Sequence, residues 1–177
     1  MNYIEMFLLG HKPAIYGTTL EKLMDHMVFY LKQRYPYLEN GGINLIDEAD
    51  TFLFFQKEEQ KQNFMDQFRQ IRPKSPEFHY LLGTTLGYPP KAVQFYKQAM
   101  LSKRLDRRRV GIYYLGISCS SNIDDLTENC AWLWETYPFP VGMEIRVDTS
   151  FEMVKYKDWH RLRQIQEDVK RKLAINP

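Results

Sequence analysis

The chain has 177 residues, of which 44% are hydrophobic and 26% are charged, and its formal net charge is +2. The length suits one domain with a core of its own, so residues 1–177 are expected to form a single domain. So small a net charge does not indicate a nucleic-acid-binding protein, although it leaves room for a local basic patch.

Aromatic residues make up 15% of the chain, and the 12 tyrosines exceed the 11 phenylalanines. A Tyr-rich surface often binds something, whereas a core built from rings accounts for the same composition. The two cysteines, Cys119 and Cys130, are not spaced as metal ligands or as a disulfide framework, which fits a reducing cytoplasm. No two histidines have metal spacing either, so we expect no metal and no cofactor.

The N-terminal segment predicts helices and no membrane anchor. Its first apolar run, residues 3–9, is short, contains Glu5 and follows no basic segment, so we expect neither a signal peptide nor a membrane span. That run predicts one or two helical turns. A second helix, capped by Thr18 and ended by Pro36, is predicted to bury one apolar stripe: Leu20, Leu23, Met24, Met27, Val28 and Leu31.

Two short strands and an amphipathic helix are predicted next. Residues 43–46 and 51–56 would pair as a hairpin around the acidic loop 47–50. The loop spells Asp-Glu-Ala-Asp, but no phosphate-binding glycine loop precedes it, so we interpret it as a solvated turn. Residues 58–71 follow with apolar side chains on one side of a helix.

Residues 76–109 are the most patterned stretch of the chain. Pro76 can open a helix, Gly87 can end it in the left-handed conformation, and Pro89 and Pro90 can open the next one. We therefore expect a central helical hairpin at 76–101, followed by the basic tail 103–109. The spacing also looks like a helix-turn-helix, although any helical hairpin with a glycine turn produces it.

Nucleic acid is accordingly an alternative partner for this stretch. Lys91, Gln94 and Gln98 would meet base edges in the major groove. Phosphates would be held by six cations: Lys97, Lys103, Arg104, Arg107, Arg108 and Arg109.

The remaining residues complete an α+β fold. They predict a central strand at 110–119, a helix at 124–136, a strand or bent hairpin at 142–156 and a closing helix at 157–175. The first strand, the helix and the next strand have the order of a right-handed parallel crossover. The predicted architecture is a small mixed sheet covered by helices, with the central helical hairpin.

Cys119 is the candidate nucleophile of an alternative, enzymatic function. It ends the predicted strand just before a helix begins, where a thiolate is favoured, and residues 118–122 could hold an anion there. A small core cysteine with a polar helix cap explains the same residues. No arginine follows at the spacing of a Cys-based phosphatase, so no catalytic residue is assigned.

Several short motifs in the first 100 residues resemble an uncharacterised family of small bacterial proteins with an LGYP signature. The similarity ends after Gln98, and it implies no activity, cofactor or catalytic residue. The motifs that carry it are His11-Lys12-Pro13-Ala14, the run FLFFQKEE, Pro76, His79, Leu82-Gly83, Leu86-Gly87-Tyr88-Pro89 and Val93.

The sequence favours a non-enzymatic interaction protein, such as a regulator, adaptor or inhibitor that binds a partner protein. The reasons are the lack of a catalytic constellation, the Tyr-rich composition and the small size. An exposed aromatic and apolar patch of several hundred Å² would be the expected sign of such a function.

Overall fold

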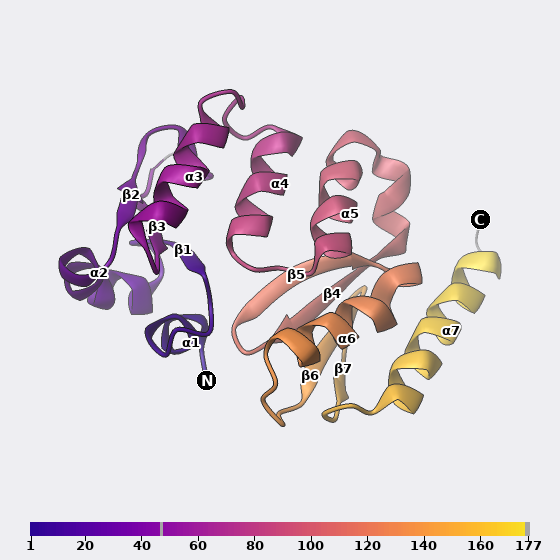
Figure 1. The fold of residues 1–177 in the computed structure, drawn as a ribbon. Helices are drawn as coiled ribbons and strands as arrows, with labels where there is room; N and C mark the ends of the chain where they lie inside the picture. The colour runs from indigo at the N-terminus through magenta and orange to yellow at the C-terminus, as the bar shows by residue number, and fades with distance from the viewer. Residues whose placement is uncertain (47, 176–177) are drawn as a thin grey trace. The chain divides into compact units, whose positions relative to one another are not determined.

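The computed structural model describes residues 1–46 and 48–175, and the chain divides into two compact units, Met1–Gly87 and Tyr88–Pro177. Within the described residues, each unit combines helices with one antiparallel sheet (Figure 1). The α+β class is therefore confirmed, whereas two antiparallel sheets stand where one mixed sheet was predicted. The single domain stays a prediction.

The first unit is built around a sheet with the strand order β1-β3-β2. Its elements in chain order are α1 (Tyr3–Leu8), β1 (Ala14–Thr18), α2 (Lys22–Arg34), β2 (Tyr37–Glu39), η1 (Gly41–Ile43), β3 (Thr51–Phe55), α3 (Glu58–Phe68) and α4 (Pro76–Thr85).

The central strand β3 is buried along its whole length because side chains cover both of its faces. Phe52 and Phe54 belong to a core cluster that includes residues of α1 and α2. Phe55 points the other way and packs against Phe64 of α3, with ring centroids 5.8 Å apart. The continuous apolar sequence of β3 matches this two-sided cover, since a strand buried on both faces needs no polar alternation.

The predicted hairpin of residues 43–46 and 51–56 is wrong. Ile43 ends the 3-10 turn η1, and β3 pairs with β1 and β2 instead. β1 escaped the prediction because Pro13 precedes it and Gly17 interrupts it, and both residues are typical of loops. Asp47, in the predicted loop, lies outside the described residues.

The helix α2 buries a narrower stripe than predicted. Met24 and Leu31 are fully buried, but Leu20 is 67% exposed and Leu23 is exposed as well. Thr18 does not cap the helix, because it ends β1 opposite Thr51. Met27 and Val28 are partly buried against the same core cluster, so four of the six predicted residues face the core.

The second unit contains a four-stranded sheet with the order β5-β4-β6-β7. Its elements are α5 (Pro90–Leu101), η2 (Lys103–Arg108), β4 (Arg109–Tyr114), β5 (Ile117–Asn122), η3 (Ile123–Asp125), α6 (Leu126–Thr136), β6 (Met143–Val147), β7 (Ser150–Val154) and α7 (Trp159–Ile175).

The strand predicted at 110–119 is in fact a tight hairpin of β4 and β5. Leu115 and Gly116 form its two-residue turn, with φ values of 51° and 73°. Since β5 reverses the chain, β4 and β6 pair antiparallel, and the strand that runs parallel to β6 is β5, with β4 between them. The crossover through α6 therefore starts from β5, and its right-handedness stays a prediction. The bent hairpin predicted at 142–156 is confirmed as β6 and β7.

Candidate functional site

The two faces of the second sheet differ sharply in burial. Along β4, Val110, Ile112 and Tyr114 are buried, whereas Gly111 and Tyr113 between them are only partly covered. Because successive side chains alternate and paired residues share a face, the strand register defines the opposite face. We call it the open face, and its residues are Arg109, Gly111, Tyr113, Ser118, Ser120, Asn122, Glu144, Arg146, Phe151 and Met153.

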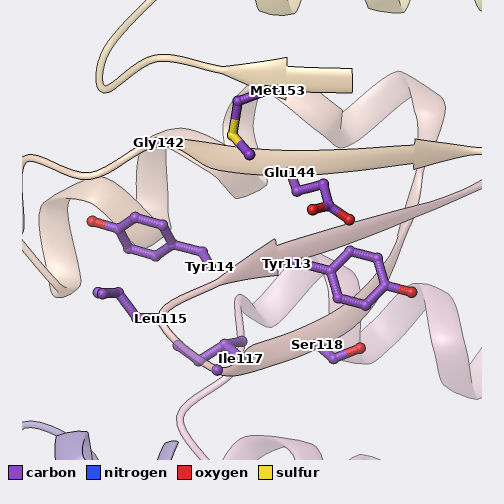
Figure 2. Close-up of a pocket in the computed structure, with 9 residues that line it drawn as sticks. Tyr113, Tyr114, Leu115, Ile117, Ser118, Gly142, Glu144 and Met153 are labelled. Carbon is purple, nitrogen blue, oxygen red and sulfur yellow. The ribbon is translucent and has the colours of Figure 1, made fainter. Parts of the chain in front are cut away.

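Two rows of cross-strand neighbours run across the open face. The first row consists of Ser118, Tyr113, Glu144 and Met153, which Figure 2 shows following one another across the four strands. The second row consists of Ser120, Gly111, Arg146 and Phe151. Each row therefore ends at β7 on a large apolar side chain.

Phe151 and Met153 are 57% and 64% exposed, which is unusual for large apolar side chains in the middle of a strand. The Phe151 ring lies 6.1 Å from the Tyr113 ring, and the Arg146 guanidinium lies 5.7 Å from the Phe151 ring centre. Arg146 also donates through Nε to the carbonyl oxygen of Asp148, at 3.0 Å. These contacts hold an aromatic and cationic cluster on the open face.

A hollow of about 320 Å³ lies at one end of the open face, where Tyr113, Ser118, Glu144 and Met153 line it together with the β4–β5 turn. Gly111 keeps the neighbouring surface flat. A Cβ atom at Gly111 would lie 3.1 Å from the Tyr113 ring and 3.3 Å from the Arg146 Cβ. The open face thus combines a flat stretch with a shallow depression.

Tyr114 shows how the covered face differs. Its hydroxyl donates to the carbonyl oxygens of Tyr137 and Phe139, at 2.8 and 2.7 Å. Burial raises the pKa of Tyr114 to about 12. Tyr114 therefore clamps the segment after α6 and is part of the framework beneath the site.

Three of the nine predicted nucleic-acid contacts are ion-paired inside the second unit. Lys91 binds Asp125 and Glu128, at 3.2 and 2.6 Å, and these two hydrogen bonds, led by that of Glu128, raise its pKa. Arg108 pairs with Asp124. Arg109 pairs with Asp106 at 2.7 Å.

The other six predicted contacts are spread over α5 and η2. Gln94 and Gln98 are exposed on α5, and Lys97 is half-buried there. Exposed cations on η2 are Lys103, Arg104 and Arg107. Because α4 belongs to the first unit and α5 to the second, the DNA-reading helix pair stays a prediction.

The inward side of α5 also differs from the prediction. Val93 is buried as expected, but Tyr96 is only half-buried and Met100 is exposed. Their places in the core are taken by Ala92, Phe95 and Ala99. Small residues at two of these three positions let the helix approach its neighbours closely.

Cys119 does not occupy the predicted strand end. It lies in the middle of β5, opposite Ile112, and β5 continues to Asn122. Both cysteines carry free thiols, and burial raises the pKa of Cys130 well above its ordinary value, with Cys119 adding to the effect. Within residues 1–46 and 48–175, no three His, Cys, Asp or Glu side chains form a group that could hold a metal ion.

Three of the motifs behind the LGYP resemblance contact one another inside the first unit, whereas Tyr88, Pro89 and Val93 belong to the second. The buried Lys12 donates through Nζ to the carbonyl oxygen of Leu86, at 2.9 Å. Gln56 donates through Nε2 to the carbonyl oxygens of Lys12 and Phe7, at 3.1 and 2.5 Å. Gly87 follows in the left-handed conformation with φ of 72°. These residues therefore join the start of β1 to the ends of β3 and α4.

Two further hollows are present. One of about 390 Å³ runs along α7 past His160, Arg163 and Glu167. The other, of about 230 Å³, lies in the first unit and is lined by the amides Gln60 and Gln67 among others. Among their described lining residues, neither shows the nucleophile, base and orienting group that catalysis requires.

No protein family, curated protein or solved structure matches the chain. The LGYP resemblance therefore stays a prediction. In the part of the chain that the structure describes, every helix is too short or too polar to cross a membrane.

The open face was missed at the level of sequence, although a signal for it exists. In β6, Met143 and Ile145 alternate with Glu144 and Arg146, which is the pattern of a strand with one covered face. In β7, the alternation places Phe151 and Met153 on the same side as Glu144 and Arg146. Two apolar residues on the polar side of a hairpin are the signal of an exposed apolar surface.

Proposed function

We propose that the protein is a non-enzymatic interaction protein, acting as a regulator, adaptor or inhibitor, that binds a partner protein through the open face. The observation that carries the proposal is the exposure of Phe151 and Met153 beside Tyr113 and Arg146 on an uncovered sheet. Two free cysteines are in line with a reducing cytoplasm as its location.

The composition of the open face favours a protein as the partner. Aromatic residues, Met and Arg are enriched in protein–protein interfaces, and Tyr and Arg recur among the residues that contribute most to binding. Met adapts its shape to a partner surface because its side chain is unbranched and polarisable.

The charge of the open face does not favour a nucleic acid. Arg146 and Arg109 are balanced by Glu144 on the face and by Asp106, which pairs with Arg109. Binding to a phosphate backbone draws its affinity from surplus positive charge, and little surplus is present here.

Photo-crosslinking tests the proposal directly. The photoreactive amino acid p-benzoylphenylalanine replaces Tyr113 in the full chain, which is then expressed and irradiated in the source organism. A matched control carries it in place of Glu135, an exposed residue of α6. We expect a discrete crosslinked protein from position 113 and none from position 135. Arg146→Glu should lower the yield of the crosslinked protein about 30-fold, which is the effect of losing a strong interface contact.

Two results would contradict this proposal. One is crosslinking at position 113 that does not exceed that at position 135. The other is crosslinked material that nuclease digestion removes, which would show that the face binds nucleic acid.

A further inference from the structure

β7 is an edge strand whose free side coincides with the apolar end of the open face. Among the described strands it pairs with β6 and stands last in the sheet order. Residues 148–149 form a two-residue turn, so the pair Val147 and Ser150 closes the hairpin with mutual hydrogen bonds.

Because bonded and non-bonded pairs alternate in an antiparallel ladder, Glu152 and Val154 also bond to β6. The main-chain N–H and C=O groups of Phe151 and Met153 therefore point to the free edge. The same two residues expose their side chains on the open face. The free edge of β7 thus presents main-chain hydrogen-bonding groups and apolar side chains from the same two residues.

This edge lacks lysine, proline and a bulge, three of the features that usually prevent strand pairing, and its one inward-pointing charge, Glu152, is neutralised by an ion pair. Natural edge strands are protected by lysine or proline residues, by bulges or by inward-pointing charges. β7 reads Ser-Phe-Glu-Met-Val, and its carboxylate, Glu152, is bound to Arg161 of α7 at 2.5 Å on the opposite side of the sheet. An unprotected edge of this kind is suited to receive another strand.

Charge indicates the kind of strand that fits. Exposed Lys155 and Lys157 directly follow β7, and Arg146 is exposed on β6. Glu152 is already paired and Glu144 lies inward of Met153 on β6, so the exposed charges just beyond the end of β7 are the positive ones of Lys155 and Lys157. A segment with an acidic residue near Lys155 and apolar residues beside Phe151 and Met153 complements it.

We infer that the partner protein contributes an extended segment, apolar at alternate positions and acidic at one end, which adds to β7 as a fifth strand. This inference rests on the proposed function. The added strand continues the two rows of the open face, so that its side chains pack beside Phe151 and Met153. Its main chain supplies the hydrogen bonds, and the side chains supply the specificity.

The test separates the main chain of Met153 from its side chain. Met153→Pro removes an N–H group that points to the free edge, and no bond to β6 is lost, so the hairpin tolerates it. Met153→Thr keeps the N–H group and a residue favoured in strands, but removes the long side chain. Both variants carry the photoreactive residue at position 113, and their thermal unfolding confirms that they are folded.

We expect Met153→Pro to lower the yield of crosslinked partner about tenfold, the effect of roughly 1.4 kcal/mol in binding. Met153→Thr should lower it less than about threefold, because the main-chain hydrogen bonds remain. A second measurement uses a synthetic peptide with the sequence of the crosslinked partner segment. When it binds, amide hydrogen exchange should slow at Phe151 and Met153.

Three outcomes would overturn the inference, and each has a separate meaning. Equal crosslinking by Met153→Pro and the unsubstituted chain shows that the open face binds without strand addition, which leaves the proposed function intact. A crosslinked species of twice the mass of this chain shows that the occupant is a second copy. A lack of crosslinking in the unsubstituted chain removes the proposed function as well. If Met153→Pro does not fold, Phe151→Pro takes its place, because its N–H group points the same way.

Discussion

The two units of the chain cover their sheets differently. In the first unit, side chains cover β3 on both faces, and its five residues are all buried. In the second unit, β4 and β6 bury one face and leave the other accessible. Strand composition follows this difference, since β3 reads Thr-Phe-Leu-Phe-Phe whereas β6 alternates Met, Glu, Ile, Arg and Val. A continuous apolar strand therefore indicates a sheet that is covered on both faces, and an alternating strand indicates a sheet with one face free.

Both units nevertheless expose apolar side chains, but on different kinds of element. The first unit exposes them on and beside α2, where Phe29 is 73% exposed and Leu20 is also uncovered. The second exposes Phe151 and Met153 on its sheet. A helix face presents side chains only, whereas the β7 edge presents main-chain groups as well, which is why the proposed site lies in the second unit.

The largest expected effect comes from one phenylalanine in each sheet. Phe54→Ala in β3 should destabilise the protein by about 3–5 kcal/mol, because it opens a cavity in a core that is closed on both sides. Phe151→Ala in β7 should change stability by less than about 0.5 kcal/mol, since its ring is mostly solvated. Urea unfolding of both variants measures the difference. Similar losses of stability for the two substitutions would show that Phe151 is packed against other residues and that the face it lies on is covered.

The two-sided cover of β3 could be recognised from sequence, but its neighbours could not. The run from Phe52 to Phe55 was correctly assigned to a strand. Its partner β1 was hidden, because Gly17 occurs there for a packing reason, close contact with Met24. The α2 stripe was overestimated, because helical spacing shows which residues can share a face but not how far a small sheet extends beneath them.

The β4–β5 hairpin was hidden for a different reason. Its turn is Leu115-Gly116, and Leu115 adopts a positive φ that short-range turn signals assign to Asn, Asp or Gly. The pairing of β4 with β6 then decides that Tyr113 shares a face with Glu144, and this long-range pairing does not follow from local pattern. The β6–β7 hairpin alone carries a local signal, the alternation that places Phe151 and Met153 beside Arg146 and Glu144. Composition alone thus favoured a binding function, which stays a proposal, and it located no surface for it.

Two glycines, one in each sheet, test the same difference in cover with smaller expected changes in stability. Gly17 lies in β1 against α2, and an added Cβ would come within 2.6 Å of the Met24 Cε. Gly17→Ala should therefore cost about 1–3 kcal/mol through overpacking, unless the end of Met24 moves aside. On the open face, Gly111→Ala meets the movable side chains of Tyr113 and Arg146 and should leave stability within about 0.5 kcal/mol.

Thermal unfolding and partner crosslinking should respond in opposite ways to these two substitutions. Gly17→Ala should lower the melting temperature and leave crosslinking at position 113 unchanged. Gly111→Ala should leave the melting temperature unchanged and reduce crosslinking, because it roughens the flat part of the open face. A stability loss at Gly111 as large as that at Gly17 would contradict the assignment of a free face.

The smallest expected effect concerns the covered face of the second sheet, through Tyr114. Tyr114→Phe should cost about 1 kcal/mol at neutral pH, the net contribution of one buried hydroxyl hydrogen bond.

Because the folded chain raises the pKa of Tyr114 from 10.0 to about 12, the folded state holds its proton where the unfolded state has released it. The corresponding stability is complete below pH 10 and is lost as the pH rises towards 12. Urea unfolding between pH 9 and 12 should therefore show a steeper alkaline loss for the unsubstituted chain than for Tyr114→Phe. Tyr113, one residue along β4 on the open face, provides the matched control: Tyr113→Phe should change the free energy of unfolding at neutral pH by less than about 0.5 kcal/mol. An equal loss for both variants would mean that the two faces of β4 do not differ in solvent access, and the comparison between covered and open faces would fail at the strand where it is drawn most sharply.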